Sequence, residues 1–363
     1  MDEEMEKSSM AILNGHDGLR TTVRARAPLR LGLAGGGTDL SPYCEDYGGA
    51  VLNCTIDKYA YAFISGRDDG NVVFRAVDLG IEETFPVDAI QHSKLALHAG
   101  VYRHFVKEFR QGSPFAATIT TNVDAPAGSG LGSSSALVVA LVDVMRAYLD
   151  VPLGPYDVAH LAFVIERIDL GFAGGKQDQY AAAFGGVNFI EFLAGDRVIV
   201  NPLRMSDTIL NEIETSIVVC FSGQSRESAI IIDNQTAGMK SGTTRTIDAL
   251  HQLKADAVEM KRALLQGNVE DMATILNHSW ISKKATANAV TNSHLDALYE
   301  IGLKAGALGG KVSGAGGGGY MMFIVPPEER YRLVTALNSA GAQASPVKFT
   351  PLGCETWQAK REG

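Results

Sequence analysis

The stretch PAGSGLGSSSALVVA, residues 126–140, joins a glycine-rich loop to three serines and then to an apolar run. Glycines let a backbone approach a ligand closely, and the free N–H groups at the start of a helix attract anions. The stretch therefore predicts a phosphate-binding loop at the head of a buried helix. A tight turn in which Ser133 or Ser134 only caps a core helix is the alternative that these residues leave open. A Walker loop is excluded, because no Gly-Lys-Ser/Thr follows the glycines.

Two further glycine-rich stretches favour the phosphate interpretation. APLRLGLAGGGTDL, residues 27–40, carries a carboxylate at its end, and KVSGAGGGGYMMFIV, residues 311–325, runs into an apolar strand. Glycine is common in ordinary turns, but turns alone do not explain three such loops in one chain. We therefore expect the three stretches to serve one site.

The composition limits the partners of the chain. With 363 residues, 46% of them hydrophobic, it is long enough for two packed domains or one large one. A net charge of −9 without a basic run argues against nucleic acid or an anionic membrane as partner, and no apolar stretch reaches the length of a membrane span. Homo-oligomer formation stays open. The acidic residues 1–20 are typical of a solvated tail. Reduced thiols in a cytoplasmic protein are expected from the scattered cysteines, which are Cys44, Cys54, Cys220 and Cys354.

The order of the expected elements indicates an α+β chain in two lobes, residues 21–205 and 206–363. Alternating residues predict two strands that flank a turn at Pro28. The segments YAYAFISGR and NVVFRAV, separated by DDG, predict a hairpin over residues 59–77. Apolar spacing predicts helices over residues 94–110, 134–149, 156–168, 177–184, 246–266, 271–284 and 295–305.

Together, the three glycine-rich stretches resemble the three motifs of the GHMP kinases, the superfamily of galactokinase, homoserine kinase, mevalonate kinase and phosphomevalonate kinase. The resemblance covers residues 21 to about 350, and GLGSSSA is its most specific part. It implies a two-lobe α+β fold with the active site in the cleft between the lobes. It also implies ATP as the phosphoryl donor and Mg²⁺ as the metal.

In chain order, the three stretches are residues 27–40, 126–140 and 311–325. The resemblance assigns the second of them, residues 126–140, to ATP and its metal. Ser134 and Glu166 are expected to bind Mg²⁺, which prefers a few protein oxygens and takes its other ligands from phosphates. Glu166 has an alternative as an exposed helix residue that pairs with a lysine or arginine. The residues expected to wrap the ATP phosphates are Gly128, Ser129, Gly130, Leu131, Gly132, Ser133, Ser134 and Ser135.

Asp178 and Arg30 match the catalytic pair of the family. Phosphoryl transfer needs the acceptor oxygen aligned with the γ-phosphate and the charge neutralised, so one carboxylate, one cation and Mg²⁺ suffice. An arginine nearby keeps Asp178 ionised, which favours a role in orienting the acceptor hydroxyl and taking its proton late. A true general base is the rival interpretation. An ordinary ion pair is the alternative without chemistry.

The first and third stretches are expected to contact the acceptor through Gly36, Gly37, Thr38, Asp39, Gly314 and Gly316. Asp39 matches a sugar-binding aspartate of galactokinases, although a turn aspartate is equally common there. Galactokinases carry Glu-His where this chain has Gly36 and Gly37. With FSGQSRESA, HSWISKKA and GGKQDQYAAAFGGVNFIEF, the first stretch resembles the branch that phosphorylates the anomeric oxygen of D-glycero-D-manno-heptose 7-phosphate for bacterial surface polysaccharide.

A phosphorylated acceptor needs cations at its far end. We expect Arg226 and Lys176 to bind that phosphate ahead of Lys283, because a guanidinium fits a phosphate with two hydrogen bonds and Lys176 is close to Asp178 in sequence. Lys311 is expected to be structural. The alternatives are another sugar kinase of the superfamily, for galactose or fucose, or a regulator that binds nucleotide or sugar without catalysis. An oxidoreductase is disfavoured, because no βαβ unit with a ribose-binding acid follows the loops.

Overall fold

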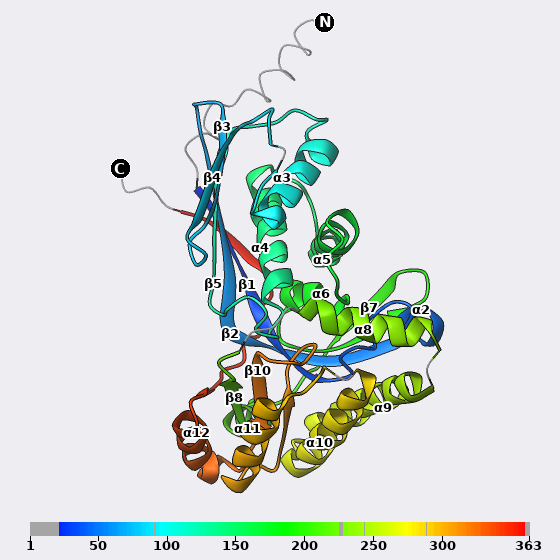
Figure 1. Ribbon diagram of the computed structural model, residues 1–363. Helices are drawn as coiled ribbons and strands as arrows, with labels where there is room; N and C mark the ends of the chain where they lie inside the picture. Colours follow the sequence, from blue (N-terminus) through cyan, green and yellow to red (C-terminus); the bar gives the residue numbers. More distant parts are fainter. Residues whose placement is uncertain (1–21, 91, 225–227, 243, 288, 360–363) are drawn as a thin grey trace, which may run out of the picture.

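The computed structural model describes residues 22–90, 92–224, 228–242, 244–287 and 289–359 (Figure 1). The expected tail, residues 1–20, lies outside them. The larger sheet has eight strands in the order β12-β1-β2-β5-β3-β4, and β6 and β7 extend from β2. The strands are β1 (Thr22–Ala34), β2 (Gly49–Gly66), β3 (Asn71–Ala76), β4 (Ile81–Pro86), β5 (Ala117–Val123), β6 (Val187–Leu193), β7 (Arg197–Pro202) and β12 (Glu355–Gln358).

Helices cover one face of this sheet, with α4 directly against β1 and β2 (Figure 1). Most residues in the middle of α4 are apolar, and they lie on all sides of the helix. The helix is therefore buried between the sheet and the outer helices. The helix expected over 156–168 is α-helical only to Phe163 and continues as a π-helical turn, Val164–Asp169. The helices of this lobe are α2 (Tyr43–Tyr47), α3 (Ala96–Phe109), α4 (Ser133–Tyr148), α5 (Pro155–Phe163) and α6 (Gln177–Phe184).

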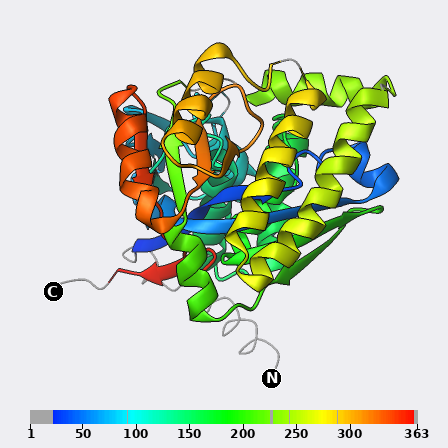
Figure 2. The same cartoon turned by 90° about the horizontal axis from the view of Figure 1, so that it is seen from below.

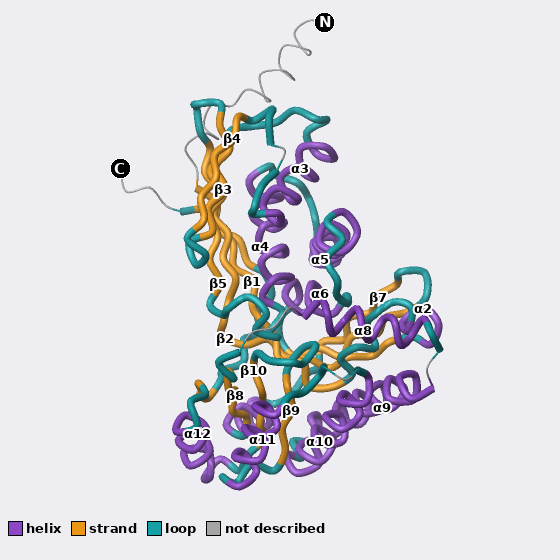
Figure 3. Tube along the Cα trace, in the orientation of Figure 1, coloured by secondary structure: helices purple, strands orange, loops and turns teal. Residues whose placement is uncertain are grey.

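The second lobe is built on a four-stranded antiparallel sheet in the order β11-β8-β10-β9. The long helices α9 and α10 lie side by side below the larger sheet (Figures 2 and 3). The strands are β8 (Ile217–Phe221), β9 (Gly309–Val312), β10 (Tyr320–Ile324) and β11 (Gln343–Pro346). The helices are α7 (Asp207–Thr215), α8 (Ser228–Lys240), α9 (Thr244–Gln266), α10 (Val269–Thr286), α11 (Ser293–Lys304), a short 3₁₀ turn (Pro327–Glu329) and α12 (Arg330–Ser339). None of the helices in the described residues is both long and apolar enough to cross a membrane.

Three local predictions are wrong. The segments 59–67 and 71–77 do not pair, because β5 lies between them and pairs in parallel with β3. Pro28 makes no turn, because β1 continues through it with a bulge before Arg30, and a bulge tolerates the missing N–H. The expectation that all of 206–363 belongs to the second lobe is wrong at its end, where β12 pairs with β1.

The three glycine-rich stretches meet at the junction of the lobes. Arg30 N donates to Leu131 O over 3.0 Å, and Tyr320 N donates to Ser129 O over 2.8 Å. Gly130 has a positive φ of 78°, and a Cβ there would lie 2.4 Å from the Ser313 carbonyl oxygen. Only glycine allows the second and third stretches to approach this closely.

Gly130→Ala should destabilise the fold more than Gly70→Ala. Both glycines have positive φ, but a Cβ at Gly70 would meet nothing within 4 Å. Gly70→Ala should therefore cost only the backbone strain, about 1 kcal/mol, whereas Gly130→Ala adds the clash with Ser313 and should cost ~3 kcal/mol. Urea unfolding of both variants measures the difference. Equal losses would contradict a tight contact between the two loops.

Candidate active site

A cavity of about 850 Å³ lies between the lobes and is lined by all three glycine-rich stretches. The predicted interlobe cleft is therefore present. Helices α8, α9 and α10 of the second lobe close it on the other side, through residues such as Ile232, Leu253 and Lys283. The predicted site residues that line it are Arg30, Gly36, Gly37, Asp39, Gly128, Gly130, Gly132, Ser133, Ser134, Ser135, Glu166, Asp178 and Gly314.

Arg30 and Asp178 form an ion pair at the wall of this cavity. Arg30 follows the bulge of β1, and Asp178 lies in the first turn of α6. Arg30 Nε and Nη2 lie 2.8 and 2.6 Å from Asp178 Oδ1. The positive end of the α6 dipole also favours the carboxylate. Gly132 brings the second stretch beside the pair, since a Cβ there would lie 3.2 Å from Asp178 Cγ.

Glu166 is fully buried in the π-helical turn and contacts the start of α4. Ser134 Oγ donates to its Oε1 over 2.7 Å, and Ser135 Oγ donates to its Oε2 over 2.8 Å. Arg167 Nη1 lies 3.3 Å from Oε1, and Gln179 Nε2 donates to Oε2 over 2.7 Å. The alternative of an exposed surface glutamate is therefore wrong. The capping alternative also fails for Ser134, because Gly132 is the N-cap and no side chain caps α4.

Ser134 and Glu166 together fit a magnesium ion. They place a hydroxyl and a carboxylate oxygen 2.7 Å apart at the edge of the phosphate loop. Mg²⁺ takes one or two protein oxygens of this kind and completes its octahedron with phosphate and water. Within the described residues, no cluster of three or more His, Cys, Asp or Glu side chains forms a denser metal site.

Asp39 lines the cavity and is almost fully buried. Its carboxylate accepts hydrogen bonds from Gly37 N, Gln177 N and Gln177 Nε2, each over 3.1 Å. These donors fix the orientation of the carboxylate, and its remaining lone pairs can accept hydrogen bonds from hydroxyl groups. Thr38 does not line the cavity, because its Oγ1 lies 2.8 Å from Gly35 O and 2.9 Å from Ala50 O.

Three other predicted binding residues also lie behind the cavity wall. The side chains of Ser129 and Leu131 are buried and their carbonyl groups accept the hydrogen bonds that join the loops. A Cβ at Gly316 would lie 2.6 Å from the Val290 carbonyl, which places this glycine against the backbone of the second lobe. These residues hold the loops together.

The structure does not bring Lys176 into the cavity. Its Nζ contacts Asp196 Oδ1 at 2.6 Å and Glu45 Oε1 at 3.2 Å, so two carboxylates neutralise it behind the wall. Arg226 lies outside the described residues. Two other lysines line the cavity: Lys283, whose Nζ donates to Gly36 O over 2.9 Å, and Lys311.

Lys311 was expected to be structural, and sequence reasoning missed its place in the cavity. Lys311 is the first residue of the third glycine-rich stretch, and Ser313 Oγ of that stretch lies 3.4 Å from Arg30 Nη1. The position of Lys311 in this stretch was the available signal. Burial, together with the positive charges of Lys283 and Arg30, lowers the pKa of Lys311 to about 7, although Asp256 opposes the shift. Burial likewise lowers the pKa of Lys283 to about 8, although Asp39 opposes the shift.

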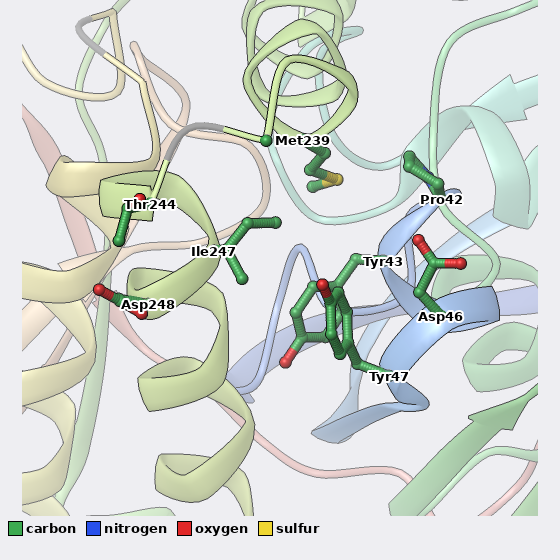
Figure 4. A pocket seen from close by; sticks show the side chains of 9 residues that line it. Pro42, Tyr43, Asp46, Tyr47, Met239, Thr244, Ile247 and Asp248 are labelled. Carbon is green, nitrogen blue, oxygen red and sulfur yellow. The ribbon is translucent and has the colours of Figure 1, made fainter.

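A second cavity of about 250 Å³ lies between α2 and the α8–α9 junction (Figure 4). Tyr43 and Tyr47 form its floor, with ring centroids 5.2 Å apart, and Tyr43 Oη lies 2.8 Å from His251 Nδ1. The phenol is thus already paired. None of the predicted site residues lines this cavity, so the chemistry belongs to the larger one.

Comparison with known proteins agrees with this geometry. Two family models match the chain, GHMP kinases N terminal domain at residues 96–186 and GHMP kinases C terminal at residues 260–343. A D-glycero-alpha-D-manno-heptose 7-phosphate kinase of Campylobacter jejuni is 41% identical, over 93% of this chain and 99% of its own length.

Solved structures share the fold. A D-glycero-D-manno-heptose 1-phosphate kinase from Bacteroides thetaiotaomicron is 40% identical with a TM-score of 0.79, over 93% of this chain and all of that one (100%). Lactococcus lactis galactokinase complexed with galactose is 18% identical with a TM-score of 0.73, over 98% of this chain and 100% of that one. The expected two-lobe α+β fold is confirmed, and the chain belongs to the GHMP kinases.

Proposed function

We propose that the chain transfers the γ-phosphoryl group of ATP to the anomeric C1 hydroxyl of D-glycero-D-manno-heptose 7-phosphate, giving the 1,7-bisphosphate. The Arg30–Asp178 pair, at the point where the three glycine-rich stretches meet, carries the kinase part of this proposal. The relative from Campylobacter jejuni supports this acceptor, since its name specifies heptose 7-phosphate. The Bacteroides structure is named for heptose 1-phosphate, so it supports a heptose phosphate but not the position of the transferred group. The bisphosphate would supply nucleotide-activated heptose for bacterial surface polysaccharide.

Gly128 to Ser135 would hold the triphosphate of ATP. The loop ends at the N-terminus of α4, where backbone N–H groups and the helix dipole favour anions. Ser134 and Glu166 would hold Mg²⁺ there, and the metal would neutralise charge on the transferring phosphates. Arg30 would add a fixed positive charge on the acceptor side of the same phosphoryl group.

Asp178 would accept a hydrogen bond from the C1 hydroxyl and orient its oxygen toward the γ-phosphate. Because Arg30 neutralises this carboxylate, we favour a late transfer of the hydroxyl proton to Asp178 over an early general-base step. Asp39 would hold ring hydroxyls further along the cavity. Gly36 and Gly37, without side chains, leave room there for a seven-carbon sugar.

We place this reaction in the cytosol. The four cysteines are free thiols in the structure, and three of them are buried, which suits a reducing compartment. Recovery of the native protein from the periplasm or the medium by cell fractionation would contradict this assignment.

Heptose 7-phosphate should be the best acceptor in a coupled assay. The panel compares kcat/KM for heptose 7-phosphate, free heptose, mannose, galactose, fucose and mevalonate with saturating ATP. The 7-phosphate should give the highest value, because the cavity offers buried positive charge beside the sugar site. A preference for galactose, fucose or mevalonate would reject the acceptor. ATP binding without turnover of any acceptor would favour a regulator.

Asp178→Asn should reduce turnover by at least about a thousandfold and leave ATP affinity within a few-fold. The amide keeps the size of the side chain but loses the charge that orients the acceptor hydroxyl and takes its proton. Steady-state kinetics gives the turnover, and equilibrium titration with a fluorescent ATP analogue gives the affinity. Near wild-type turnover at saturating acceptor would show that Asp178 has no such role.

Ser134→Ala should raise the Mg²⁺ concentration needed for half-maximal activity and lower turnover, because one hard oxygen ligand is lost. Ser133→Ala is the matched control, since Ser133 lines the same loop and no hydrogen bond is observed between its side chain and Glu166. Activity as a function of free Mg²⁺ separates the two. If both variants follow the wild-type titration, the metal is not bound through Ser134.

A further inference from the structure

Two buried lysines of the cavity have no part in the phosphoryl-transfer chemistry described above. Lys283, on α10, is 7% exposed, and Lys311, on β9, is 8% exposed. Both line the cavity. Burying an ammonium group is costly unless a partner compensates its charge. These two positions therefore call for a partner of opposite charge.

The protein supplies little of that charge. No ion pair within 4.0 Å joins either lysine to a carboxylate in the described residues. The Lys283 ammonium group donates to a neutral carbonyl, and no hydrogen bond from the Lys311 ammonium group is observed within the described residues. Two carboxylates interact electrostatically with the lysines, Asp39 with Lys283 and Asp256 with Lys311. Both carboxylates already accept other hydrogen bonds, Asp39 from Gln177 and Asp256 from Ser279 and Gln252. Arg30 adds a third positive charge near both lysines. Asp233 of α8 also lines the cavity.

The position of the lysines relates them to the acceptor. Lys283 Nζ lies at Gly36, and a Cβ at Gly37 would come within 3.4 Å of that nitrogen. Gly37 thus keeps the ammonium group open to the cavity beside Asp39. The metal pair, Ser134 and Glu166, belongs instead to the nucleotide loop.

We infer that Lys283 and Lys311 together bind the phosphate group that the acceptor already carries. This inference rests on the proposed function for the identity of the acceptor. With the reacting hydroxyl at Asp178 and ring hydroxyls at Asp39, the phosphate of a phosphorylated sugar lies between the two ammonium groups. The positive charge that the protein's own side chains leave uncompensated is then paired, and unphosphorylated sugars lose that pairing.

The inference makes acceptor binding depend on protons. With pKa values near 8 and 7 in the free protein, Lys283 and Lys311 are partly deprotonated at pH 8. A bound phosphate dianion stabilises the charged forms of both lysines. Asp39 and Asp256 act in the same direction, whereas the positive charge of Arg30 acts against them. The phosphate itself is already fully ionised at this pH, since its second pKa is about 6. Binding should therefore take up protons at pH 8.

Calorimetric titration without nucleotide tests the assignment, comparing heptose 7-phosphate with free heptose for wild type, Lys283→Met and Lys311→Met. Each substitution should weaken binding of the 7-phosphate by about tenfold to a hundredfold and leave free heptose and ADP within about threefold. Lys284→Met is the matched control, because Lys284 lies on the same helix over the Trp280 ring and does not line the cavity. It should change none of these affinities. Titration at pH 8 in buffers of different ionisation enthalpy should show proton uptake that shrinks in both cavity variants.

Three results would overturn the assignment: unchanged binding of the 7-phosphate, equal losses for phosphorylated and free heptose, or a selective loss of ADP, which would give the lysines to the nucleotide. If a methionine variant does not fold, the test uses Lys283→Arg in place of that variant and inorganic phosphate in place of heptose 7-phosphate. Phosphate should raise the melting temperature of wild type and Lys283→Arg more at pH 7 than at pH 9, and a pH-independent effect rejects the inference. If the wild-type protein does not bind heptose 7-phosphate but phosphate raises its melting temperature more at pH 7 than at pH 9, the proposed function is rejected and the anion site is supported.

Discussion

The ion pair between Arg30 and Asp178 is the contact on which the site depends. It joins β1 to α6, and its two side chains are 5% and 19% exposed. Removing either partner would leave the other charge poorly compensated, at a cost of about 3–5 kcal/mol for a fully buried pair. Such a pair is a weak source of stability but an exact constraint on position. Arg30 N also donates to Leu131 O, so the same residue fixes the glycine-rich stretch of residues 126–140.

The cavity is lined by two chemically different sets of residues. One set comprises a glycine loop, the N-terminus of α4, and the oxygens of Ser134 and Glu166. The other set comprises Asp39 and the two buried lysines, Lys283 and Lys311. Hard oxygens suit a metal that accompanies a triphosphate, whereas buried ammonium groups suit an anion without a metal. Under the proposed function, this division would let a phosphorylated acceptor bind to a protein whose net charge is −9.

Sequence reasoning reached the parts that local pattern encodes. The glycine stretches, the helix at residues 177–184 and the approach of Ser134 to Glu166 were all predictable. Sequence reasoning failed where the pairing of distant segments determines the structure. For example, β5 lies between two strands, β2 and β3, that were predicted to form a hairpin. Lys176 was expected to bind the phosphate of the acceptor, but residues two apart at a helix start point to different sides, and Lys176 pairs with Asp196 and Glu45 instead. Lys283 and Lys311 come from elements far apart in the chain, and only the packing of α10 on β9 brings them to one cavity.

The account makes Asp178 the group that faces the reacting hydroxyl while the existing phosphate lies at the far lysines. The position of the new phosphate tests this directly. Heptose 7-phosphate is incubated with enzyme and ATP, and phosphorus–proton coupling in the NMR spectrum of the product locates the added group. The account predicts coupling to the anomeric proton and a 1,7-bisphosphate. A phosphate on any other carbon, or release of phosphate from ATP without a sugar bisphosphate, would contradict it.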